Sequence, residues 1–307
     1  MEQRSSNEHE YEQIDLFFQK LPQPSNLSLI RQKVASFCSV QQKPIVLITS
    51  GGTAVPIEKN TVRFVDNFSA GTRGSASAEY FLRRNYAVIF LYRFKTLEPF
   101  TRHINIHSLL KSFTLDGNRK NLQVSSEMSE SLKPVVENYQ KLSESLLMVT
   151  FTTLSEYLYY LKEIALALQP LGSKAMLYLA AAVADFYIPY DNMAIHKIQS
   201  GEGPLRLHLE MVPKILRPLI KFWTPHAFVV SFKLETDESI LVTKARKALE
   251  KYGHKIVIAN ALQTRKSTVI LVEDKTDERI DVDSNSNVEI ESIIVDKLIS
   301  KHKVFMQ

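Results

Sequence analysis

Residues 45–92 decide the fold of this chain and read IVLITSGGTAVPIEKNTVRFVDNFSAGTRGSASAEYFLRRNYAVIFLY. The stretch opens with a short apolar run, residues 45–49, of the kind that forms a buried parallel strand. Two glycines follow at once. A long loop over residues 54–68 then leads to a second cluster of small residues at 69–74, an apolar helical stripe and another buried strand at 86–92. This order predicts a strand–loop–helix–strand unit whose glycines lie at the strand end and at the helix start.

Glycines in those two places favour the binding of a phosphate group. They let backbone N–H groups approach a ligand without an intervening Cβ, and the free N–H groups of a helix start attract an anion. The spacing matches neither the compact GxGxxG of dinucleotide-binding proteins nor the GxxxxGK of P-loop proteins. A turn that merely connects strand and helix uses the same residues, so spacing alone leaves both interpretations open.

Strands and helices alternate through most of the chain. Further apolar strand candidates are residues 146–151, 175–179, 228–232 and 255–260, and residues 205–210 alternate like a half-exposed strand. Residues 268–272 and 279–282 predict a late hairpin. The predicted fold class is α/β: a doubly wound, mostly parallel Rossmann-like sheet with helices on both faces and a smaller antiparallel edge or hairpin region. We expect an N-terminal helical extension, residues 1–43, and a single α/β domain, residues 44–307, with a polar insertion around residues 94–145.

Composition excludes several classes of function. The chain has 307 residues, 45% of them hydrophobic and 23% charged, with a net charge of +5. Its basic residues are spread out, which argues against nucleic acid as a partner. Residues 58–102 hold eight Lys or Arg against four acids, which suits a polyanionic small molecule or a solvated basic face. The only cysteine, Cys38, excludes an internal disulfide, and no apolar run is long enough to span a membrane, so we expect a cytoplasmic protein without a membrane partner.

Seven short motifs, in a fixed order along the chain, carry a resemblance to a known family. They are SGGT from residue 50, VRFVDNFSAGTRG from 62, LAAAVADFY from 179, HKIQSG from 196, VPKIL from 212, SFKLETD from 231 and VIANAL from 257. Together they resemble phosphopantothenoylcysteine synthetase (phosphopantothenate–cysteine ligase). The large segment between Tyr92 and Lys174 resembles the eukaryotic form of this family, which uses ATP. The resemblance implies a homodimeric ligase of coenzyme A biosynthesis. With ATP and Mg2+, such an enzyme joins 4′-phosphopantothenate to cysteine through an acyl-adenylate and releases pyrophosphate and AMP.

The resemblance also implies roles for individual residues. Asn67 matches the asparagine that positions the substrate, and Lys197 matches the lysine used in forming the acyl-adenylate. The family's bacterial KxKK pattern continues here as Ile-Gln-Ser after Lys197, so the later lysines are missing. The positions implied for the nucleotide are Gly51, Ser69, Gly71, Gly74, Phe232 and Asn260. Those implied for the acid substrate are Arg63, Asn67, Ala181, Ala182, Asp185 and Lys214. No protein ligands for a metal are implied.

Two other functions remain open from the residues alone. One is a nicotinamide-dependent oxidoreductase on a Rossmann-like sheet, against which the missing compact GxGxxG argues. The other is a nucleotide-sensing protein that binds ATP without turnover. Release of pyrophosphate distinguishes the ligase from both.

Overall fold

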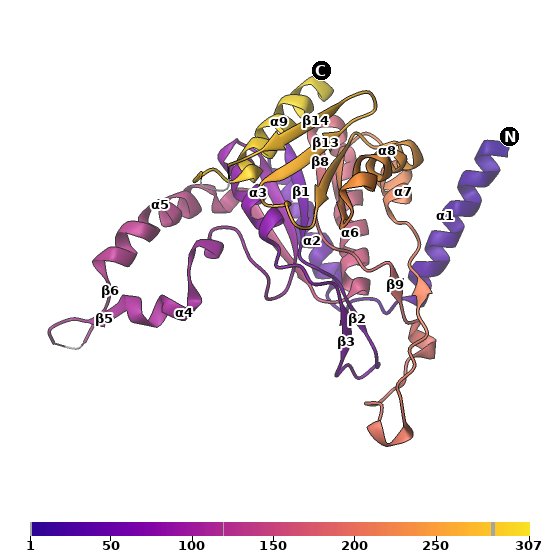
Figure 1. The fold of residues 1–307 in the computed structure, drawn as a ribbon, viewed down its shortest axis with the longest axis horizontal. Coiled ribbons are helices and arrows are strands. Elements are labelled where there is room, and N and C mark those ends of the chain that lie inside the picture. Colours follow the sequence, from indigo (N-terminus) through magenta and orange to yellow (C-terminus); the bar gives the residue numbers. More distant parts are fainter. Residues whose placement is uncertain (1, 119, 284–285) are drawn as a thin grey trace.

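The computed structural model describes residues 2–118, 120–283 and 286–307. Its centre is an eight-stranded sheet in the order β14-β13-β12-β11-β8-β1-β4-β7 (Figure 1). Six strands are parallel to one another: β1 (Ile45–Ser50), β4 (Ala87–Arg93), β7 (Leu146–Phe151), β8 (Ala175–Leu179), β11 (Phe228–Glu235) and β12 (Ile256–Ala261). The hairpin of β13 (Thr268–Val272) and β14 (Asp277–Asp281) adds an antiparallel edge. The predicted fold class is confirmed.

The chain order of the parallel strands creates a switch point in the sheet. From β1 the sheet grows to one side through β4 and β7, and to the other through β8, β11 and β12. In such sheets ligands bind outside the carboxyl ends of the two strands at which the order reverses. Here those strands are β1 and β8, which pair in register from Ile45↔Ala175 to Thr49↔Leu179.

Each face of the sheet is covered by helices, which is why its central strands read as continuous apolar runs. On one face lie α2 (Leu27–Val40), α6 (Leu154–Leu168) and the C-terminal half of α1 (Glu2–Lys20), packed on the side chains of Leu47 and Leu177. The other face carries α3 (Thr72–Arg83) and α9 (Ile290–Phe305). α8 (Leu241–Tyr252) packs on β12 and β13. Cys38, on α2, is partly buried, and burial raises the pKa of its thiol to about 11.

Three segments project from this body (Figure 1). The first is the hairpin of β2 (Ala54–Pro56) and β3 (Phe64–Asp66), where the sequence predicts only a loop. The second follows β9 (Phe186–Tyr187) and returns through β10 (Glu210–Met211). The third lies in the predicted insertion and contains α4 (Ile106–Leu109), the hairpin of β5 (Phe113–Leu115) and β6 (Leu122–Val124), and α5 (Ser126–Leu142).

Short helical turns complete the chain. They are η1 (Thr101–His103), η2 (Leu110–Ser112), η3 (Ser143–Ser145), η4 (Gln169–Lys174), η5 (Tyr190–Asn192), η6 (Ser200–Glu202), α7 (Leu216–Pro218), the π-turn η7 (Leu219–Trp223) and η8 (Glu238–Ile240). The strand predicted for residues 205–210 is wrong: only Glu210 and Met211 pair, with β9. Among the described residues, no helix is long and apolar enough to cross a bilayer.

Candidate active site

The loops after β1 and β8 stay paired beyond the ends of their strands. Gly52 forms a parallel bridge with Ala182. The backbone N–H of Ala182 donates to the carbonyl oxygen of Gly51 at 2.8 Å, and the N–H of Thr53 donates to that of Ala182 at 3.1 Å. Threonine hydroxyls add to this pairing, because Thr53 Oγ1 accepts from the N–H of Ala184 at 2.9 Å. The switch point therefore brings the first glycine pair and the alanine run together.

The start of α3 lies against the end of β1 with no room for side chains. A Cβ built on Gly74 would fall 2.4 Å from Ser50 Oγ, and that hydroxyl donates to the carbonyl oxygen of Gly71 at 3.1 Å. Gly71 caps the helix with φ +78°, in the left-handed region that favours glycine. The 12-residue helix thus presents free N–H groups beside the strand end, which is a suitable place for an anion. Ser69 lies in the partly exposed loop just before it.

Asn67 is held directly over Gly52. A Cβ on Gly52 would lie 1.8 Å from the carbonyl oxygen of Asn67 and 3.2 Å from its Cβ, so only glycine permits this approach. The N–H of Asn67 donates to the carbonyl oxygen of Thr53 at 3.2 Å. The asparagine is therefore fixed at the switch point, with its side chain partly exposed.

Arg93 is a site residue that the sequence interpretation missed. It ends β4, and its guanidinium donates to the carbonyl oxygen of Gly52 and to Asp66 Oδ1, both at 2.8 Å. Its Cβ and the side chain of Thr96 also lie against Gly51, whose φ is +83°. Its position at the carboxyl end of a central strand was the available signal.

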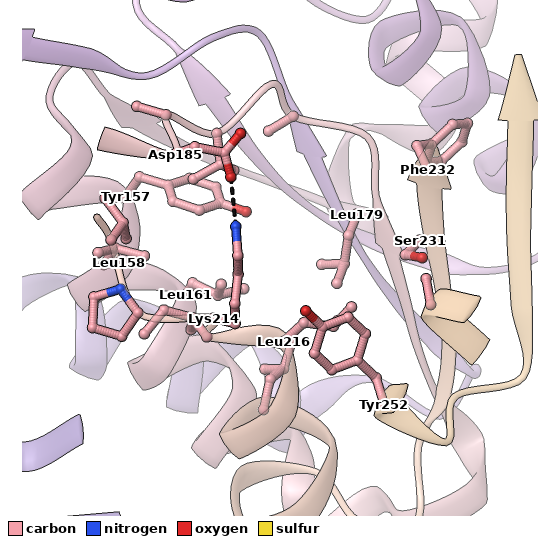
Figure 2. Close-up of a pocket in the computed structure, with 18 of the residues that line it drawn as sticks. Tyr157, Leu158, Leu161, Leu179, Asp185, Lys214, Leu216, Ser231, Phe232 and Tyr252 are labelled. Carbon is pink, nitrogen blue, oxygen red and sulfur yellow. Dashed lines mark hydrogen bonds and ion pairs between the residues drawn. The ribbon is translucent and has the colours of Figure 1, made fainter. Parts of the chain in front are cut away.

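A cavity of about 330 Å³ opens beside the end of β8 (Figure 2). Its walls are mostly apolar and come from α6, the end of β8, the segment 212–219 and α8. At one side Lys214 Nζ lies 2.6 Å from Asp185 Oδ1, and both side chains are exposed. Ala181 also lines the cavity. Three residues that the family resemblance implies for the acid substrate thus border one cavity.

Two of the positions implied for the nucleotide, Phe232 and Asn260, lie on the neighbouring strands β11 and β12. Phe232, on β11, borders the cavity but lies well away from the Asp185–Lys214 pair in Figure 2. Its ring makes an edge contact with Tyr178, with the centroids 4.9 Å apart. Asn260, near the end of β12, is buried, and its Nδ2 donates to the carbonyl oxygen of Lys233 at 3.4 Å. Both residues thus lie toward the carboxyl ends of their strands.

Arg63 and Lys197 lie on the projecting segments and do not line the cavity. The Arg63 guanidinium pairs with Glu58 and also donates to the carbonyl oxygen of Ile198 at 3.1 Å. Lys197, one residue earlier, is exposed. The structure therefore brings Arg63 and the Lys197 segment together, on the hairpin that leads into Asn67.

A doubly wound sheet, a glycine-bordered helix start and a cavity at the strand ends are features typical of nucleotide-binding α/β proteins. The family model for the DNA/pantothenate metabolism flavoprotein C-terminal domain matches residues 163–301. Phosphopantothenate–cysteine ligase of Mus musculus is 44% identical over 299 residues, which are 94% of this chain and 96% of that protein. The Saccharomyces cerevisiae ligase CAB2 is 41% identical, over 93% of this chain and 85% of that protein.

Structural comparison agrees with these matches. A Cab2 mutant solved in complex with phosphopantothenate-cysteine has a TM-score of 0.87 and 40% identity, over 95% of this chain and 98% of that chain. The DNA/pantothenate metabolism flavoprotein from Streptococcus pneumoniae, at 20% identity and a TM-score of 0.58, shares the fold. The chain belongs to the phosphopantothenate–cysteine ligase family.

Proposed function

We propose that this chain is a ligase of coenzyme A biosynthesis that joins 4′-phosphopantothenate to the amine of cysteine. Full-length relatives bearing that name and the Cab2 product complex support this activity. The single observation that carries it is the placement of Asn67 against Gly52 and the Ala182 loop at the switch point. An amide fixed there can stabilise charge that develops on an acyl oxygen.

The reaction has two steps in this proposal. The carboxylate of phosphopantothenate attacks the α-phosphorus of ATP, and the bond to pyrophosphate breaks. The amine of cysteine then attacks the acyl carbon, loses a proton and displaces AMP. Substrate atoms react with each other in both steps, so the protein supplies position and charge stabilisation rather than a nucleophile.

Each part of the site has an assigned role. The N–H groups around Gly51, Ser69, Gly71 and Gly74 receive the phosphates and ribose, while Phe232 and Asn260 contact the rest of the nucleotide. The acid substrate lies by Ala181, Ala182 and Asp185. Lys214 and Arg63, each of which already pairs with a carboxylate, are the basic side chains proposed to offset its negative charges. Lys197 offsets charge as the carboxylate meets the α-phosphate. Asn67 then stabilises the negative charge that develops on the acyl oxygen during attack by cysteine.

ATP is the proposed nucleotide because the large segment between Tyr92 and Lys174 resembles the eukaryotic form of the family. Mg2+ would reduce the charge of the triphosphate. The nearby carboxylates of Asp66 and Asp185 are each paired with a basic side chain. In the described ranges, no group of three His, Cys, Asp or Glu residues could hold a metal. The phosphates themselves would therefore supply most of the ligands of the ion.

The proposed assembly is a homodimer. Apolar side chains in or next to the projecting segments are left uncovered by a single chain: Phe68 is 98% exposed and Met211 77% exposed. Exposed apolar surface of this kind favours association. The cytoplasm is the proposed compartment, on the composition of the sequence alone.

Pyrophosphate release tests the function. Purified protein mixed with phosphopantothenate and cysteine should release pyrophosphate with ATP and much less with CTP. Release with CTP alone would correct the nucleotide, and release with neither would overturn the ligase assignment. A nicotinamide-dependent oxidoreductase would instead bind the nicotinamide cofactor and release no pyrophosphate, and family membership disfavours it.

A further inference from the structure

We infer that Glu58 is a positioning residue that acts through Arg63 to dock the Lys197-bearing segment, residues 193–198, onto the hairpin that leads into Asn67. The inference rests on the proposed function, because it concerns the two residues assigned to the chemistry. Asn67 and Lys197 lie 130 positions apart in the chain. The contact of Glu58 and Arg63 with residues 193–198 holds the two segments that carry them together.

The centre of the junction is a buried carboxylate. The side chain of Glu58 is 0% exposed, whereas the paired Arg63 side chain is 38% exposed. Glu58 Oε1 accepts from Arg63 Nε at 2.9 Å and from a second guanidinium nitrogen, and Oε2 accepts from the backbone N–H of Arg63 at 3.3 Å. Burying a charge is costly unless it is paired and hydrogen-bonded, and Glu58 meets both conditions.

Arg63 passes this constraint on to the docked segment. Glu58 binds one side of the guanidinium, and Arg63 Nη2 also donates to the carbonyl oxygen of Ile198 at 3.1 Å. Because the guanidinium is a planar fork, fixing it on Glu58 also fixes the direction of this third bond. The hydrogen bond from Arg63 keeps the pKa of Glu58 below its ordinary value, so the pair stays charged near neutral pH.

Backbone pairing gives the docked segment a register. The N–H of Lys59 donates to the carbonyl oxygen of Ala194 at 2.8 Å, and the N–H of Asn60 donates to that of Ile195 at 3.0 Å. Asn60 Nδ2 also lies 3.4 Å from His196 Nδ1. Lys197 therefore lies between His196 and Ile198, which are each hydrogen-bonded to the hairpin, although its own side chain is exposed.

The first test replaces Glu58 by Gln, which keeps the size but removes the charge and turns one accepting oxygen into an NH2 donor that faces the N–H groups of Arg63. We expect at least a tenfold lower kcat for pyrophosphate release, with little change in KM for ATP. Amide hydrogen exchange should rise in residues 58–63 and 193–198 but not in the central sheet. The matched control is Glu163→Gln, which breaks the bidentate pair with Arg31 between α6 and α2 and should leave kcat and both exchange regions unchanged.

The second test restores the docking by other means. In a Cys38→Ser background, cysteines are placed at positions 60 and 196, whose side chains meet at 3.4 Å in this structure, in order to join the segment to the hairpin by a disulfide. The readout is the first burst of pyrophosphate, measured with ATP and phosphopantothenate before cysteine is added, because cysteine is a thiol and would reduce the disulfide. Oxidation of this pair in the Glu58→Gln protein should recover most of the lost burst rate, and reduction should remove the recovery. A role of Glu58 in stability alone would not give this reversible recovery.

Two results would overturn the inference: wild-type kcat and exchange in Glu58→Gln, or no recovery on oxidation. Failure of the proposed function is separate, because the wild-type protein would then release no pyrophosphate while exchange would still report docking. Lys197→Ala completes the set. If that variant kept full activity, slow turnover in Glu58→Gln could not be assigned to Lys197, and the inference would fail.

Discussion

The carbonyl oxygen of Asn67 occupies the space in which a side chain at Gly52 would begin, 1.8 Å from the position of its Cβ. The loop that follows β1 and the loop that follows β3 thereby meet in backbone contact at the switch point of the sheet. The position of the asparagine thus depends on the absence of one carbon atom.

Gly52→Ala should therefore damage catalysis more than folding. The added methyl group must push the Asn67 segment away, and a displacement of about 1 Å in a reacting group can cost on the order of 100-fold in rate. We expect a fall in kcat of that order in steady-state pyrophosphate assays. Gly117→Ala is the control, because a Cβ there has no neighbour within 4 Å. Equal activity of the two variants would contradict the contact.

Arg93→Ala should lower kcat/KM by roughly 10- to 100-fold. The change removes bonds from a charged donor to the Gly52 carbonyl oxygen and to Asp66, and a hydrogen bond to a charged group is worth about 1.5–3 kcal/mol. Arg93→Lys keeps the charge and should recover only part of the loss. Arg279→Ala breaks an exposed pair with Asp281 and should stay within about twofold, as expected for surface ion pairs. Full activity in Arg93→Ala would refute the role.

Asn67→Asp should stall the second step. A carboxylate at this place repels the charge that develops on the acyl oxygen, whereas the first step needs no such donor. Rapid-quench analysis should show a burst of pyrophosphate close to one per active site, with acyl-adenylate trapped on the protein. Normal steady-state turnover would show that the amide has another role.

Stability should depend on pH through His254. Burial lowers its pKa from 6.5 to about 4, and Ser231 Oγ lies 2.7 Å from its Nε2. Between these pH values the unfolded chain binds the proton and the folded protein does not, so stability is lost as the pH falls below 6.5. The difference in unfolding free energy between wild type and His254→Gln should shrink by about 2 kcal/mol from pH 7.5 to pH 5 in urea titrations. The control is His226→Gln, at an exposed position. The difference in unfolding free energy between wild type and this variant should be the same at pH 7.5 and pH 5.

The central sheet was predictable because its strands are buried on both faces. Residues 45–49 and 175–179 form continuous apolar runs, and such runs predict strands without knowledge of their partners. A Thr-x-x-Glu pattern at residues 153–156 is a sequence signature of a helix start, and both hydrogen bonds of this capping box are present.

The projecting segments were not predictable from local pattern. Residues 205–210 alternate in polarity, yet no strand pairs with residues 205–209, because pairing depends on which backbone lies alongside. The β2–β3 hairpin was missed for the same reason. At the site, the motifs named Gly51, Asn67 and Ala182 as candidates, and the structure brings these three residues together. The motifs could not show that Arg63 binds Glu58 and the Lys197 segment, since that contact joins parts of the chain far apart in sequence.

The sheltered position of Cys38 has a consequence for redox chemistry. With a pKa of about 11, roughly one thiol in a few thousand is ionised at pH 7.5, and only the thiolate attacks disulfides. The chain has no other cysteine. A ligase that takes free cysteine as its substrate therefore carries almost no reactive thiolate of its own. Cystine, which forms when that substrate is oxidised, would form a mixed disulfide with the enzyme only very slowly.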